Sequence, residues 1–70
     1  MKNHIEIIKI EHYHAIALNG KLIVPCSSDA LEKDLQAVFN VMPESRTSIS
    51  TKHFDDGEVD EFYSYCDELK

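Results

Sequence analysis

The dipeptide Asn19-Gly20 constrains the fold of this chain more than any other feature. It separates two β-rich runs, HYHAIAL and KLIVPC, and Asn-Gly tolerates the positive φ angles that a two-residue type I′ turn requires. The sequence therefore predicts a β-hairpin. In its simplest register the cross-strand pairs are Leu18–Lys21, Ala17–Leu22, Ile16–Ile23 and Ala15–Val24.

The two faces of this hairpin differ in polarity. One face is wholly apolar and consists of Tyr13, Ala15, Ala17, Leu22, Val24 and Cys26; the other is mixed and consists of His14, Ile16, Leu18, Lys21 and Ile23. We expect helices to pack on the apolar face and Pro25 to end regular pairing. If helices cover only that face, the isoleucines and the leucine of the mixed face form an apolar patch.

The run HIEIIKI upstream is also typical of a strand, but its apolar parity changes between Ile7 and Ile8. One straight strand from His4 to Leu18 would extend about 50 Å at 3.3 Å per residue. A strand of that length would be longer than the diameter of a domain of this size. The sequence therefore predicts a bulge, a sharp bend or a turn near Glu11-His12, and does not decide among them.

The segment SSDALEKDLQAVFNVMP has helical periodicity. Ser27 or Ser28 can cap the helix, Asp29 favours its first turn, and Pro43 ends it. The apolar stripe is Leu31, Leu35, Val38, Phe39 and Met42. Asp34 interrupts the apolar side, so we expect it at the margin of the stripe.

The segment SRTSISTKHF, with Ile49 as its main apolar residue, predicts an edge strand or a lightly buried one. On a helical wheel at 100° per residue, the apolar residues of the final segment occupy one arc of about 160°. They are Val59, Phe62, Tyr63, Tyr65, Cys66 and Leu69. This separation from the acids favours an amphipathic helix that begins near Glu58. The alternative is a hairpin, STKHF-DDGE-VDEFYSY.

Together these elements predict an α+β fold of approximate order ββ(β)αβα. Its small antiparallel sheet, built on the Asn19-Gly20 hairpin, packs against two amphipathic helices on one face. The chain has 70 residues, of which 43% are hydrophobic, so we expect residues 1–70 to form a single small domain.

The net charge of -6 comes entirely from the last sixteen residues. Residues 1–54 contain six acids and six bases, which cancel. Residues 55–70 contain one base, Lys70, and seven acids: Asp55, Asp56, Glu58, Asp60, Glu61, Asp67 and Glu68. Because Lys and Arg do not cluster anywhere, direct binding of nucleic acid is disfavoured.

The N-terminal segment has charges where a signal peptide would have an apolar core, and no stretch approaches the roughly 20 apolar residues of a membrane span. We therefore expect a cytoplasmic protein that does not bind membranes, with Cys26 and Cys66 reduced. A disulfide between them is a minor alternative.

The sequence contains only weak indications of metal binding or catalysis. His12 and His14 could share a metal if both lie on one strand, with His4, His53 or the cysteines as further ligands. Nevertheless, no metal-binding spacing such as C-x-x-C or H-E-x-x-H is present. The DDGEVDE run does not fit a calcium loop, and a Cys/His nucleophile pair has no acidified thiol. We expect no metal, no cofactor and no enzymatic activity.

The acids of the last segment are the remaining indication of function. Almost no bases lie among these acids, and the negative charges of Asp67 and Glu68 oppose the helix macrodipole. From Asp60 to Glu68 the helix rises about 12 Å. Its four carboxylates then have an average spacing near the 3.4 Å per charge of a nucleic-acid strand.

We therefore expect a small acidic module that inhibits or regulates a larger protein by docking on its basic surface, which in the strong form of the hypothesis is a nucleic-acid-binding site. Small phage-encoded inhibitors of nucleases and bacterial defence complexes act this way, an analogy of size and charge alone. The alternative is a structural or regulatory homodimer assembled through sheet edges or the mixed hairpin face, with no such partner.

Overall fold

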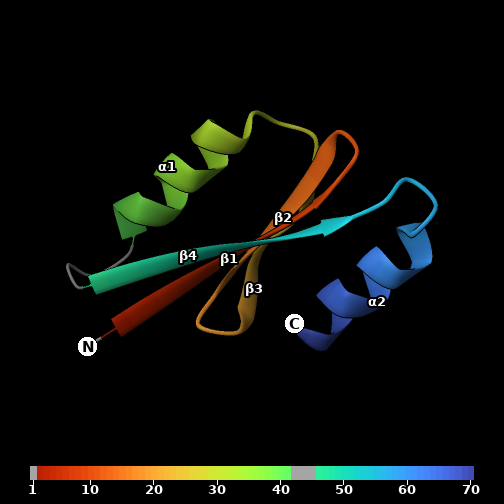
Figure 1. Ribbon diagram of the computed structural model, residues 1–70. Helices are drawn as coiled ribbons and strands as arrows, with labels where there is room; N and C mark the ends of the chain where they lie inside the picture. The colour runs from red at the N-terminus through yellow and green to blue at the C-terminus, as the bar shows by residue number, and fades with distance from the viewer. Residues whose placement is uncertain (1, 42–45) are drawn as a thin grey trace.

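The fold consists of four strands and two helices (Figure 1). It is described by a computed structural model that covers residues 2–41 and 46–70. In chain order the elements are β1 (Lys2–Ile10), β2 (Tyr13–Leu18), β3 (Lys21–Ser27), α1 (Leu31–Val41), β4 (Arg46–Phe54) and α2 (Val59–Glu68). The predicted α+β class, the hairpin and both helices are confirmed. The predicted ends of the first helix, Met42 and Pro43, lie outside the described residues.

The sheet has the strand order β3-β2-β1-β4. β1 pairs antiparallel with β2, and β2 antiparallel with β3, whereas β4 runs parallel to β1. The sheet is therefore mixed, and the expectation of a purely antiparallel sheet is corrected. The physical reason is α1, which returns the chain along the sheet as a crossover connection and so allows the next strand to run parallel.

Of the bulge, bend or turn expected near Glu11-His12, the structure contains the turn. β1 ends at Ile10, and Glu11 and His12 form a two-residue turn before β2, with Glu11 at a φ of 48°. The second turn is the predicted one, since Asn19 and Gly20 have φ angles of 53° and 83°. Asn19 also exchanges hydrogen bonds of 2.8 Å with the backbone of His4, which fixes this turn against β1.

The two helices lie on opposite faces of the sheet (Figure 1), not on one face as expected. The core under α1 contains Ile5, Ile7, Ile16 and Val38. The core under α2 contains Ile8, Ile10, Ala15, Ala17, Phe62 and Cys66. The parity change in β1 therefore needs no bulge: the first half of the strand is apolar toward α1 and the second half toward α2.

The register of the β2–β3 hairpin departs from the simple prediction. Leu18 pairs with Lys21 and Ala17 with Leu22 as expected, but Ile16 pairs with Val24 rather than with Ile23. Two register shifts cause the difference, and they turn Val24 toward the core under α1. The mixed hairpin face is thus covered at Ile16, which is fully buried, whereas Ile23 is 39% exposed.

The end of the hairpin also differs from expectation. β3 continues past Pro25 to Ser27, which pairs with His14. Because proline has no N–H to donate, the ladder is irregular before this point. As a result Cys26, which was predicted on the packed apolar face, is exposed, while Cys66 is buried; both thiols are free.

Candidate functional site

The acids of residues 55–68 lie on a helix and the turn before it, as the sequence predicts. α2 buries Phe62 and Cys66 against the sheet, and Asp60, Glu61, Asp67 and Glu68 are exposed. Asp55 and Asp56 are exposed in the preceding turn, and the half-buried Glu58 accepts a hydrogen bond of 2.9 Å from the backbone N–H of Asp55. We call the four exposed carboxylates of α2 the acidic face.

The protein's own bases neutralise little of the acidic face. Within residues 2–41 and 46–70, the only lysine or arginine ion pair joins Lys70 to Asp67 at 3.1 Å, and both side chains are exposed. An exposed pair of this kind contributes about 0–1 kcal/mol. The negative charge of Asp60, Glu61 and Glu68 is therefore directed to solvent.

The two ends of the acidic face have opposite effects on the helix. Asp60 and Glu61 lie in the first turn of α2, where negative charge is favourable. Asp67 and Glu68 lie in the last turn, which has no basic residue, and each opposes the macrodipole by about 0.3–1 kcal/mol. Folding therefore does not explain the second pair of acids.

Specific contacts hold the opposite side of α2 against the sheet. The Tyr65 hydroxyl donates a 2.6 Å hydrogen bond to the Glu6 carboxylate, which raises the pKa of Tyr65 to about 12. The Lys52 ammonium lies 5.3 Å from the centre of the Tyr65 ring and 5.4 Å from that of Phe54. These contacts fix the helix and so the direction of its acidic face.

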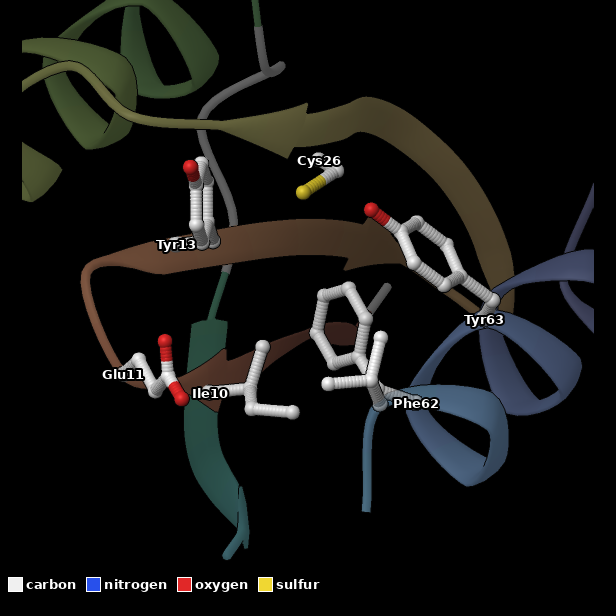
Figure 2. A pocket seen from close by; sticks show the side chains of 7 residues that line it. Ile10, Glu11, Tyr13, Cys26, Phe62 and Tyr63 are labelled. Atoms are coloured by element: carbon white, nitrogen blue, oxygen red, sulfur yellow. The ribbon is translucent and has the colours of Figure 1, made fainter. Parts of the chain in front are cut away.

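A small pocket lies beside the first turns of α2 (Figure 2). Its volume is about 60 Å³, and its lining comes from the Glu11 turn, from Tyr13 and Cys26 of the hairpin, and from α2. Tyr63 directs its hydroxyl toward the Cys26 sulfur (Figure 2), and its electrostatic and hydrogen-bond interaction with the Cys26 side chain raises the pKa of Tyr63. Partly exposed aromatic surface thus adjoins the acidic face.

A second polar cluster joins α1 to the sheet. His14, only 4% exposed, donates a 2.6 Å hydrogen bond from Nε2 to the Asp34 carboxylate, and the Ser27 hydroxyl donates one of 2.9 Å to the same oxygen. In a catalytic triad the histidine lies between serine and carboxylate. Here the carboxylate lies between the other two, which is the arrangement of a structural anchor.

The Asp34 anchor makes stability depend on pH. The hydrogen bond from His14, followed by that from Ser27, lowers the pKa of Asp34 below its ordinary value of 3.8. The folded state favours the ionised carboxylate. The stabilisation is therefore complete when the pH is above the ordinary pKa of 3.8, and it is lost as the pH falls through the lowered pKa of the folded state. We expect Asp34→Asn to be less stable than the wild type at neutral pH, with the difference narrowing below about pH 4.

Urea unfolding of both proteins from neutral pH to strongly acidic pH measures this effect. The matched control is Asp29→Asn, because Asp29 is an exposed acid close to the same cluster. Its effect should be at most about 0.3–1 kcal/mol, the value of one carboxylate near a helix N-terminus, and smaller than that of Asp34→Asn. A difference between Asp34→Asn and the wild type that stays constant as the pH falls would contradict the role given to this carboxylate.

The other candidate ligands are not brought together. His12 is exposed in the β1–β2 turn, whereas His14 is buried against Asp34. His4 hydrogen-bonds Ser48 and Ser50 of β4, at 2.8 and 2.9 Å. In the part of the chain that the structure describes, no three His, Cys, Asp or Glu side chains form a group that could hold a metal ion.

Most of the contacts that the sequence did not predict join residues far apart in the chain, and one, Ser27–Asp34, joins residues seven positions apart. They are His14–Asp34, Ser27–Asp34, His4–Ser48, His4–Ser50 and Tyr65–Glu6. One local indication existed, because Asp34 interrupts an apolar stripe and a buried acid requires a partner. The partner itself cannot be identified from α1 alone.

No protein-family model, no curated protein and no solved structure matches this chain. Among the described residues, none of the helices has the length and apolar character needed to cross a membrane. The fold and the site therefore define a small α+β domain that displays an acidic helix.

Proposed function

We propose that the protein binds a larger protein with a basic surface, and that the acidic face of α2 is the contact. The observation that supports this most is the exposure of four carboxylates on one side of a helix whose other side is fixed to the sheet. A face held in place loses little conformational entropy on binding. Its charge attracts a basic partner over a distance of about 10 Å at ordinary salt.

The spacing of the acids indicates what kind of basic surface would fit. Asp60 and Glu61 form one pair and Asp67 and Glu68 another. The centres of the two pairs are about 10.5 Å apart along the axis at 1.5 Å per residue. The complementary surface therefore has two clusters of Lys or Arg at a similar separation. Arginine in particular can bind a carboxylate through two parallel hydrogen bonds.

The strongest form of the proposal is that the basic surface is a site for DNA or RNA. Such sites present regularly spaced cations, and a helix with carboxylates along one side can occupy them in place of phosphates. The protein would then act as an inhibitor or regulator of a nucleic-acid-binding protein. Added nucleic acid should compete with it for the same surface.

Capture from cell lysate with the immobilised protein tests the proposal. We expect a partner with a basic surface that is retained at low salt and released at high salt, because salt screens exposed charges. The triple reversal Asp60→Lys, Glu61→Lys, Glu68→Lys should abolish capture of that partner. Among the described residues, none of these three acids forms an ion pair. The gain from Glu68→Lys, near the helix C-terminus, offsets part of the loss in the first turn, so the variant is expected to remain folded.

A control variant distinguishes the effect of where the negative charge lies from the effect of the total net charge. Glu11→Lys, Asp29→Lys, Glu32→Lys changes the net charge equally, and these acids are exposed outside the acidic face. The proposal predicts that this variant still captures the partner, once the partner is purified and binding is measured directly. Equal loss in both variants, or binding that does not change with salt, would contradict a specific role for α2.

A further inference from the structure

The two edges of the sheet differ in how they are protected against pairing with another strand. At the β3 edge, the Leu22 N–H donates a 2.6 Å hydrogen bond to the carbonyl of Leu69, so the end of α2 covers part of the strand. Pro25 and two register shifts interrupt the rest. Proline, irregularity and cover are the usual means of protecting an edge strand.

Among the residues that the structure describes, the β4 edge has none of these features. Its nine residues pair with β1 one by one, from Lys2–Arg46 to Ile10–Phe54, without a shift in register. All residues from Arg46 to His53 are exposed. The ammonium of Lys52 lies over the rings of Phe54 and Tyr65, so this charge is held over the face of the sheet.

We propose that β4 pairs antiparallel with β4 of a second copy of this chain, about a two-fold axis at Ser50. The two four-stranded sheets then become one continuous sheet. The proposal concerns a surface other than the acidic face and does not depend on the proposed function. The pairs are Ser50 with the partner's Ser50, Ile49 with the partner's Thr51, Ser48 with the partner's Lys52, Thr47 with the partner's His53, and Arg46 with the partner's Phe54.

The distribution of charge supports a second copy as the occupant. Two chains of net charge -6 repel each other, but the segment 45–54 contains no acid. At this edge the repulsion between the acids of the two copies is therefore weakest. In the proposed register Arg46 faces the partner's Phe54 and Lys52 faces the partner's Ser48, so like charges are not directly opposed.

The register follows from comparison with the nearest alternative. A two-fold axis at Ile49 would place Arg46 opposite the partner's Lys52, and like charges directly opposite each other are destabilising. It would also leave His53 and Phe54 without a partner in β4. The axis at Ser50 pairs all nine residues and brings the two Ile49 side chains, each 52% exposed in the monomer, to diagonal positions across the interface.

Disulfide trapping tests the register. In a Cys26→Ser background, which removes the exposed native thiol, Ser50→Cys should form a covalent dimer under mild oxidation. Residues directly opposite have Cβ atoms about 4.5–5.5 Å apart, near disulfide range. Ile49→Cys should cross-link far less, because diagonal neighbours are about 7–8 Å apart. The reverse order of efficiencies would overturn the proposed axis.

Sedimentation velocity from low micromolar to millimolar concentration tests the dimer itself. We expect a reversible dimer that Ile49→Lys weakens at least about tenfold, since the substitution removes apolar contact and introduces two like charges. The matched control is Ile23→Lys on β3, also partly exposed, which should leave dimerisation unchanged. A monomer at every concentration, or a dimer that only Ile23→Lys dissociates, would overturn the proposal.

Discussion

Replacing Phe62 with alanine is expected to remove most of the stability of this protein. Phe62 is 1% exposed and is the largest fully buried side chain. Truncating a buried phenylalanine costs about 3–5 kcal/mol, and a chain of this length has a total stability of about 3.5–10.5 kcal/mol at 0.05–0.15 kcal/mol per residue. The variant should therefore be largely unfolded, or unfold at much lower urea concentration.

The physical reason is the position of this ring in the core under α2. It packs edge-on against Phe54 with centroids 5.9 Å apart, and it contacts the cluster that includes Ile8 and Ile10. The neighbouring Tyr63 is the control, since it is 52% exposed. Tyr63→Ala should lose about 0.5–1.5 kcal/mol, the value of its ring contact with Phe62. Circular dichroism in urea measures both, and equal losses would contradict the orientation of α2.

Replacing Val38 with aspartate is expected to have a similarly large effect on the other face of the sheet. Val38 is 3% exposed and belongs to the core with Ile5, Ile7 and Ile16. A carboxylate at this position would be buried without a partner, which costs about 3–5 kcal/mol. We therefore expect α1 to detach from the sheet or the domain to unfold.

The adjacent residue provides the control for this substitution. Phe39 belongs to the same apolar stripe in the sequence, but its side chain is 41% exposed. Phe39→Asp should change the free energy of unfolding by less than about 1 kcal/mol, as surface substitutions usually do. Urea unfolding followed by circular dichroism distinguishes the two variants. If Phe39→Asp proved the more damaging, α1 would face the sheet differently from the way the structure describes.

Local features of the sequence predicted much of the fold. Asn19-Gly20 identified a turn because few residues adopt two successive positive φ angles, and the apolar periodicity identified both helices. The arrangement of the helices was predicted incorrectly. Of the bulge, bend or turn that the sequence left open near Glu11-His12, the turn is present. The parity change between Ile7 and Ile8 instead reflects two helices that cover opposite faces at opposite ends of β1.

The remaining errors have a common cause. The direction of β4 and the register beyond Ala17 depend on how distant segments meet, and neither is determined by local propensity. The same applies to the site. The acids of α2 and their exposure were predictable from the helical period, but the bond between Tyr65 and Glu6, which are 59 positions apart, was not.

The most direct test of the central claim is chemical-shift mapping on the labelled protein, titrated with the purified partner that the lysate experiment identifies. The claim is that the outer side of α2 is the contact surface. It predicts that the largest amide shifts occur at residues 60–68, that they diminish with added salt, and that residues 31–38 of α1 are unaffected. Shifts concentrated in α1, with residues 60–68 unchanged, would contradict it.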